Sequence, residues 1–267
     1  MPPKIALAEN TSAIAIAPTR RPNLLVMHGE KGGVGKSFAA ALAASTALHR
    51  GLSVHIIETD SSVPDVAPRF VNAPGAAVSA IALDRDNEAS ETLTSLLGGV
   101  EALITAPNPP ALIVINSPAN ASSVLDAYAD IFATVAQSLD IDLTVGFVVD
   151  DSAAVLPRIE ASIKTGLLSI PTARRGLVYT GWRGDIARFP VATSSARASA
   201  LATGLVEHVF PGLTPASMLE TVRKSDSPIY DLLDPAAGLK IVDRSLLSRW
   251  LKQAEPLTDW LIGGSNG

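Results

Sequence analysis

Residues 28–38, HGEKGGVGKSF, place a glycine-rich turn between an apolar run and an alanine-rich stretch. The apolar residues 24–27 are typical of a buried strand, and residues 36–50 have the composition of a helix that stops at Gly51. The glycines of the turn allow backbone N–H groups to point inward around an anion, and the start of the helix favours negative charge. The stretch therefore predicts a phosphate-binding loop between a strand and a helix.

The loop supplies a group for each part of a phosphate chain. We expect Lys36 to reach the β- and γ-phosphates and Ser37 to give its hydroxyl to Mg²⁺. The general pattern GxxxxGK[ST] asks for glycine at position 30, where this chain has Glu30, so the strict motif fails by one residue. The predicted nucleotide-binding set is Gly32, Gly33, Val34, Gly35, Lys36, Ser37 and Phe38.

The composition is that of a globular α/β protein. Of the 267 residues, 47% are apolar and only 4% are aromatic, and such an aliphatic core suits helices packed on a buried parallel sheet. The formal net charge of −5 argues against a protein whose whole surface binds nucleic acid. The absence of cysteine excludes disulfides, cysteine-ligated metals and thiol nucleophiles.

Neither a membrane span nor an export signal is predicted. No apolar run reaches the roughly 18 residues that a spanning helix needs. Residues 1–23 do not resemble a secretory signal, because Glu9, Asn10 and Thr11 interrupt their apolar stretch. We expect these residues to be a loosely held extension, residues 24–267 to form a single domain, and the protein to be cytoplasmic.

Apolar strands alternate with helices along most of the chain, which is typical of a mostly parallel sheet with helices on both faces. Further strands are expected at residues 54–57, 78–83, 112–115, 144–149 and 177–179. Further helices are expected at residues 88–97, 100–106, 123–139, 152–165, 195–209, 215–224 and 245–262, the last broken near Pro256.

The stretch KGGVGKS resembles the deviant Walker A ATPases, the family of the ParA plasmid-partition and MinD septum-site proteins. The resemblance is specific over residues 24–68, is weaker out to about residue 177 and does not extend to the last third. The loop together with ETDSSVPD, residues 58–65, looks most like ParA-like proteins of plasmid mobilisation and conjugation regions. The resemblance implies a three-layer P-loop NTPase fold that binds ATP or ADP with Mg²⁺.

The resemblance gives Lys31 a specific role. In such proteins the equivalent lysine crosses the interface of an ATP-sandwich dimer and contacts the partner's nucleotide. A second cation there stabilises the charge that develops on the phosphate oxygens, and it makes dimerisation depend on the nucleotide. The alternative is an ordinary solvated lysine.

The second predicted strand leads into an acidic pattern, Glu58 and Asp60, which the resemblance places at the start of switch I. An aspartate beside the γ-phosphate can position or deprotonate the attacking water, and we assign that role to Asp60. Glu58 is expected to contact the Mg²⁺ shell or Lys36. The alternative for Asp60 is that it only begins a polar loop.

The strand in ALIVINSPA aligns with the Walker B segment of the family, which usually ends in aspartate. Here the position is Asn116, and Ser117 and Pro118 keep the surrounding pattern. An asparagine oxygen can accept a hydrogen bond from a Mg²⁺-bound water, but it brings no charge and should hold the ion less strongly. Two readings stay open: a slow ATPase in which Glu58 compensates, or a nucleotide-gated dimer with little turnover.

Residues of the last third receive weaker assignments. Thr180 or Trp182 is a candidate for contact with adenine, and a core or surface role is the alternative for Trp182. Non-specific DNA binding and a solvated face are both open for a group of basic residues: Arg174, Arg175, Arg183, Arg188, Arg197, Arg223 and Lys224. The C-terminal helix has Leu246, Leu247, Trp250 and Leu251 at helical spacing, which favours packing against the domain over membrane binding.

The leading interpretation is a ParA/MinD-like ATPase that dimerises on ATP binding and works with a protein partner in plasmid partition, maintenance or mobilisation. The second is a regulatory switch that binds nucleotide and barely hydrolyses it. A third is a metabolic enzyme on the same fold, such as a synthetase of the dethiobiotin type, for which the sequence offers no acceptor-site motif. Nitrogenase-reductase-like chemistry is excluded, because its iron–sulfur cluster needs cysteine.

Overall fold

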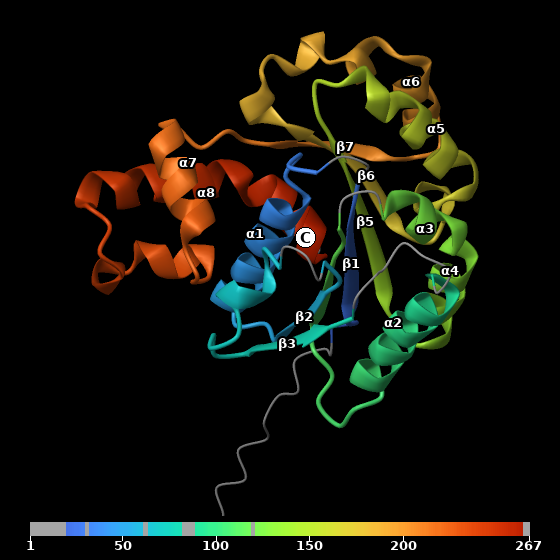
Figure 1. Cartoon of the computed structure of the whole chain (residues 1–267), viewed down its shortest axis with the longest axis horizontal. Helices are drawn as coiled ribbons and strands as arrows, with labels where there is room; N and C mark the ends of the chain where they lie inside the picture. Colours follow the sequence, from blue (N-terminus) through green and yellow to red (C-terminus); the bar gives the residue numbers. More distant parts are fainter. Residues whose placement is uncertain (1–19, 30–31, 61–63, 82–88, 119–120, 264–267) are drawn as a thin grey trace, which may run out of the picture.

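A computed structural model describes residues 20–29, 32–60, 64–81, 89–118 and 121–263. Its centre is a seven-stranded sheet in the order β3-β2-β4-β1-β5-β6-β7, in which every pairing is parallel (Figure 1). The strands are β1 (Asn23–His28), β2 (Val54–Glu58), β3 (Ala76–Ala80), β4 (Leu112–Asn116), β5 (Asp142–Val149), β6 (Arg174–Thr180) and β7 (Val206–Phe210). The predicted α/β class with a parallel sheet is confirmed.

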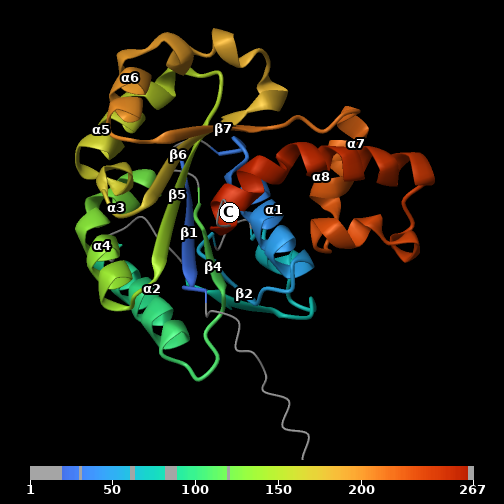
Figure 2. The same ribbon diagram turned by 180° about the vertical axis from the view of Figure 1, so that it is seen from behind.

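Helices cover both faces of the sheet and complete three layers (Figure 1). One face carries α1 (Lys36–His49), α7 (Ala216–Lys224) and α8 (Ile241–Ile262). The other face carries α2 (Ala89–Ile104), α3 (Ser122–Ala127), α4 (Ala129–Ser138), α5 (Leu156–Thr165) and α6 (Ser195–Ala202). Figure 2 shows the same two layers from behind, with α1, α7 and α8 together on one side of the strands.

Strand β1 lies near the middle of the sheet and is buried along its whole length. Its alternate residues enter the two cores: Leu24 and Val26 pack on the α2–α6 side, and Leu25 and Met27 pack on the α1 side. A strand buried on both faces needs apolar side chains at successive positions, which explains the unbroken run that begins the predicted motif. The carboxyl ends of β1, β2 and β4 meet in register, since Asn116 pairs with both Met27 and Glu58.

One predicted helix is partly wrong. Residues 195–209 do not form a single helix, because α6 ends at Ala202 and the chain turns through Gly204 (φ 84°) into strand β7. This strand lies at the edge of the sheet, and its Val206 and Val209 are exposed. Because the apolar residues of β7 face solvent as well as the core, their spacing does not reveal a strand.

Three helix boundaries also differ from the prediction. In place of the two predicted helices 88–97 and 100–106 there is one helix, α2 (Ala89–Ile104), in which Gly98 and Gly99 remain helical; residue 88 lies outside the described residues. The stretch 123–139 is divided into α3 and α4 at Tyr128. Helix α8 continues through Pro256, which is exposed and lies between the buried Ala254 and Leu257. Packing on either side of a solvent-facing proline therefore outweighs the loss of one backbone donor.

The C-terminal helix packs against the domain, as its apolar spacing predicts. Leu247, Trp250 and Leu251 are buried in the core on the α1 side. Within the part of the chain that the structure describes, no helix has the length and apolar character that crossing a membrane requires.

Candidate functional site

The loop after β1 turns at glycines whose conformations other residues avoid. Gly29 has φ 146° and Gly35, which precedes α1, has φ 111°. A β-carbon on Gly29 would lie 3.1 Å from the carbonyl oxygen of Val148 and 3.6 Å from Cδ of Lys36. The Lys36 side chain therefore runs back along the loop towards its first glycine. Glu30 and Lys31 lie outside the described residues.

The N-terminus of α1 is suited to binding an anion. Gly35 provides no side-chain cap, and the first turn contains no acidic residue. The first backbone N–H groups of a helix have no partner within the helix, and the helix dipole adds positive potential at the same place. Lys36, only 5% exposed, begins this helix. Backbone donors and one buried lysine thus converge where a phosphate chain would bind.

A cavity of about 160 Å³ opens over this helix end. Five of the seven predicted loop residues line it: Gly33, Gly35, Lys36, Ser37 and Phe38. Val34 is buried in the core beneath, and Gly32 is exposed. The remaining wall comes from Ala41, Asp65, Arg69, Trp182, Leu219 and Arg223, of which the sequence predicts only Trp182 for the site.

Glu58 and Asn116 form a buried pair at the ends of β2 and β4. Asn116 Nδ2 donates a hydrogen bond to Glu58 Oε1 over 2.6 Å. Asn116 is 1% exposed and Glu58 is 3% exposed. The backbone N–H groups of Val66 and Ala67 each donate to Glu58 Oε2 over 3.2 Å. Burial raises the pKa of the Glu58 carboxyl group, and these hydrogen bonds oppose that effect.

The amide oxygen of Asn116, Oδ1, has a different environment from the amide nitrogen. This oxygen is buried, and no hydrogen-bond partner for it exists among the described residues. Because Nδ2 is held by Glu58, Oδ1 must face away from that carboxylate. A buried acceptor of this kind and the Ser37 hydroxyl at the cavity are hard oxygen groups that suit Mg²⁺ or its bound water. No cluster of three or more His, Cys, Asp or Glu side chains in the described ranges has metal-site geometry.

Asp60 lies two residues beyond β2 and is half-buried. Its backbone N–H donates to Glu58 Oε1 over 3.4 Å. The charge of Asp60 also acts on Asp65, whose pKa is raised first by burial and then by this repulsion. Asp60 and Asp65 therefore lie close enough to repel each other, while the charges of Arg223 and Arg69 act on the pKa of Asp65 in the opposite direction.

Trp182 is the predicted base contact that the structure brings to the loop. A β-carbon on Gly35 would lie 2.8 Å from the Trp182 ring, so the indole covers the end of α1. The same ring packs edge-on against Phe210, with 5.0 Å between ring centroids. Thr180 is fully buried, and its hydroxyl donates to the carbonyl oxygen of Val149 over 3.1 Å. The structure therefore places Trp182 at the cavity and uses the Thr180 hydroxyl within the sheet.

Several arginines of the predicted basic patch have partners within the protein. Arg175 donates to the carbonyl oxygens of Leu168 and Thr203, and Arg174 lies 3.4 Å from Asp142. Arg197 pairs with Glu207 at 2.7 Å. Arg183 Nη2 donates to the Gly33 carbonyl oxygen of the loop over 3.3 Å. Each of these four arginines therefore has a partner within the protein, and DNA binding by the group stays a prediction.

Arg69 was not singled out by the sequence, yet it joins two walls of the cavity. Its guanidinium group donates to the carbonyl oxygens of Val222, over 2.9 Å, and of Arg223. These carbonyls lie at the C-terminal end of α7, where a cation is favourable. The 3₁₀ turn Ala67–Arg69 is therefore held by Glu58 at its start and by α7 at its end.

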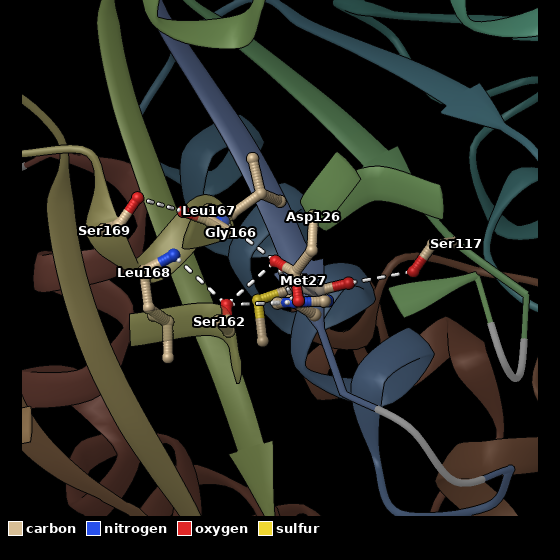
Figure 3. Close-up of polar contacts among 9 residues, drawn as sticks. Met27, Ser117, Asp126, Ser162, Gly166, Leu167, Leu168 and Ser169 are labelled. Carbon is tan, nitrogen blue, oxygen red and sulfur yellow. Dashed lines mark hydrogen bonds and ion pairs between the residues drawn. The ribbon is translucent and has the colours of Figure 1, made fainter. Parts of the chain in front are cut away.

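The last residue of β1 is held from the opposite face of the sheet. His28 is fully buried and its Nε2 lies 3.0 Å from Asp126 Oδ1. The same oxygen accepts from the Ser162 hydroxyl and from the Leu167 N–H, each over 2.8 Å (Figure 3). These bonds outweigh burial and lower the pKa of Asp126. The cluster fixes the start of the loop to α3 and α5.

Comparison with known proteins places this geometry in a wider group. No protein-family model matches the chain. The chain is 26% identical over 251 residues to the protein MobD from Acidithiobacillus ferrooxidans, which covers 90% of this chain and 98% of that protein. It also superposes on a ParA family ATPase from Chlorobium tepidum TLS with a TM-score of 0.51 and 13% identity, over 87% of this chain and 98% of the other.

The fold is that of a ParA-like P-loop NTPase. The MinD cell division protein of Aquifex aeolicus gives a TM-score of 0.43 at 14% identity, over 86% of this chain and 97% of that one.

Proposed function

We propose that this protein binds Mg·ATP and is a slow ATPase of the ParA-like type, which dimerises in response to the nucleotide. The observation that carries the proposal is the uncapped start of α1, where Lys36 and the backbone N–H groups line a cavity. Ser37 and the Asn116 oxygen would hold a magnesium ion at this loop. When bound, that ion would neutralise phosphate charge.

The chain's own groups account for binding and for slow turnover. Lys36 and the N–H groups of the loop hold the phosphates, and Trp182 covers the same helix end. Asp60 orients the attacking water from the segment after β2. Because Asn116 is uncharged, the ion is held less strongly than by an aspartate, and we expect slow hydrolysis.

A second candidate function is a nucleotide-gated switch with little or no turnover. The arrangement of Glu58 favours it, because both carboxylate oxygens already accept N–H donors from Asn116, Val66 and Ala67. A carboxylate used in this way does not replace the missing Walker B acid as a direct metal ligand. Steady-state ATP hydrolysis by the wild-type protein distinguishes the two functions.

The biological setting is proposed from similarity. The loop resembles ParA-like proteins of plasmid mobilisation regions, and the similarity to MobD extends along nearly the whole length of both chains. We therefore propose a cytoplasmic role in plasmid mobilisation or maintenance, with a homodimer formed on ATP binding and a further protein partner. Lys31 remains the residue predicted to reach the partner's nucleotide.

The direct test is nucleotide binding by the Lys36→Ala variant, measured by calorimetry with ATP and Mg²⁺. We expect at least a tenfold loss, because a charge-assisted hydrogen bond to phosphate is removed. Lys164→Ala, an exposed lysine of α5, is the matched control and should bind normally. Equal affinity of Lys36→Ala and the wild type would refute the site.

Light scattering with ADP and with a non-hydrolysable ATP analogue tests the dimer.

A further inference from the structure

At this end of the sheet an amide takes the place of one acid in the pattern that the sequence resembles. The usual acid at the end of β4 is here Asn116, and the neighbouring strand β2 carries Glu58 in register with it. The two side chains are joined by a hydrogen bond of 2.6 Å. Both are at least nine-tenths buried, so neither is an incidental surface residue.

We propose that Glu58 is the positioning residue of the site: it carries the charge that Asn116 lacks, orients the Asn116 amide and anchors the segment that contains Asp60. The proposal deepens the proposed function and rests on it only where nucleotide is involved. The positioning itself is a property of the protein without nucleotide.

The donors around Glu58 define its charge state and leave it little capacity for a metal. Oε2 accepts the N–H groups of Val66 and Ala67, and Oε1 accepts from Asn116 and more weakly from the Asp60 N–H. A carboxylate has about four lone-pair sites, and an ionised one only accepts. Four N–H donors on two oxygens therefore match the ionised form and occupy those sites. The contact of Glu58 with the Mg²⁺ shell or Lys36 stays a prediction.

The same bonds close a loop between β2 and the 3₁₀ turn Ala67–Arg69. Glu58 contacts Val66, eight residues along the chain, while Thr59 is fixed to the Asn116 carbonyl oxygen through its N–H, at 3.0 Å, and its hydroxyl, at 2.7 Å. Both ends of residues 59–66 are therefore attached to the Glu58–Asn116 pair. A carboxylate that holds the start of a helical turn is a strong local anchor.

The pair also sets the direction of the Asn116 oxygen. An amide presents its oxygen and its nitrogen on opposite sides, and an ionised Glu58 can bond only to the nitrogen. Oδ1 is thereby turned away from Glu58 and stays a buried acceptor without a partner among the described residues. Glu58 thus determines which atom of Asn116 is available to a ligand.

A reciprocal exchange tests this directly. In the double variant Glu58→Gln with Asn116→Asp, the new amide nitrogen can donate to the new carboxylate, and its oxygen can still accept from Val66 and Ala67. The double variant keeps the bonds to Val66, to Ala67 and between positions 58 and 116, loses only the weak acceptor for the Asp60 N–H, and moves the charge to β4. Glu58→Ala removes all four bonds. Glu91→Ala, an exposed glutamate of α2, is the matched control.

The primary measurement is amide hydrogen exchange of Val66 and Ala67 by NMR in the nucleotide-free protein. Glu58→Ala should speed their exchange roughly ten- to a hundredfold, since hydrogen bonds to a charged group are lost. The double variant should stay within about threefold of the wild type, and Glu91→Ala should be unchanged. Unchanged protection in Glu58→Ala, or the same loss in the double variant, would overturn the proposal. If Glu58→Ala does not fold, Glu58→Met gives the same comparison, because its side chain has a similar length and lacks the oxygens that accept the Val66 and Ala67 N–H groups.

A second measurement separates positioning from a purely structural role. Where ATP is hydrolysed, Glu58→Ala should lower kcat more than it raises KM, because the Asp60 segment is loosened while the loop at Lys36 is intact. Equal effects on both would argue against positioning. The amide exchange can change as expected while neither the wild type nor any variant binds ATP. In that case the positioning role stands and the proposed function fails.

Discussion

Asn116 Nδ2 lies 2.6 Å from Glu58 Oε1, and this bond joins β4 to β2 at the end of the sheet where α1 begins. The contact changes what an aspartate at position 116 would do. It would not simply restore the acid of the Walker B segment, because it would bring a second carboxylate against the first.

Asn116→Asp alone should therefore destabilise the protein in a pH-dependent way. Two carboxylates in contact cannot both ionise, so the pKa of one is raised well above its unfolded value. A raised carboxyl pKa favours folding at low pH, and that contribution is lost as pH rises through the folded-state pKa. The free energy of unfolding of the variant should fall towards neutral pH by about 1–3 kcal/mol more than that of the wild type.

Thermal melting between pH 4.5 and pH 7.5 measures this effect. The double variant with Glu58→Gln should melt close to the wild type across the range, because the second negative charge is removed. A single variant as stable as the wild type at neutral pH would show that the two side chains separate in solution.

Asp126 should give the opposite pH dependence. Its pKa is lowered because the bonds from His28, Leu167 and Ser162 outweigh the effect of its burial. A depressed carboxyl pKa contributes stability above the unfolded value, near 3.9, which is lost as pH falls through the folded-state pKa. Asp126→Asn should lower stability at neutral pH and should flatten the acid limb of the stability curve. A denaturant titration series from pH 2 to pH 7 measures both, and an acid limb unchanged from the wild type would contradict the assignment.

The loop and the sheet could be predicted because their signals are local. A strand, glycines and a helix follow one another within residues 24–50, and buried parallel strands read as apolar runs. The Glu58–Asn116 pair could not be predicted as a contact, because the two residues are 58 positions apart in the chain and meet only because β2 and β4 are neighbours in the sheet. Each residue was found separately, and only the register of the sheet brings them together.

The missed parts share a physical cause. Strand β7 is a short edge strand with Val206 and Val209 exposed, so it lacks the apolar run that marked the buried strands. Arg69 and Arg223 reach the cavity through the packing of α7 against the turn after β2, for which no local pattern exists. The density of arginines was visible in the sequence, but the partners that distinguish them are distant in the chain.

Two glycines should respond oppositely to alanine. A β-carbon on Gly166 would lie 2.2 Å from Asp126 Oδ1, so Gly166→Ala must displace the carboxylate that holds His28. We expect a loss of about 2–4 kcal/mol in the free energy of unfolding. Gly98 lies inside α2 with open space around it, and Gly98→Ala should raise stability by about 0.5–1 kcal/mol.

Chemical denaturation of the two variants beside the wild type measures the difference. Gly98→Ala serves as the control for the substitution itself, since both variants add the same methyl group. If Gly166→Ala were as stable as Gly98→Ala, that result would contradict the close contact between Asp126 and Gly166 at the end of α5.

Trp182 should report nucleotide binding through its fluorescence. Its ring covers Gly35 and packs on Phe210, so phosphates arriving at the start of α1 change its surroundings. We expect addition of Mg·ATP to alter the emission of the wild type and to leave Trp182→Phe almost unaffected. The affinity of Trp182→Phe should fall roughly two- to tenfold, since part of one aromatic contact is lost. Trp260→Phe is the control, because Trp260 packs on His208 away from the cavity and should preserve both the signal and the affinity. A signal that survives in Trp182→Phe and disappears in Trp260→Phe would remove Trp182 from the site.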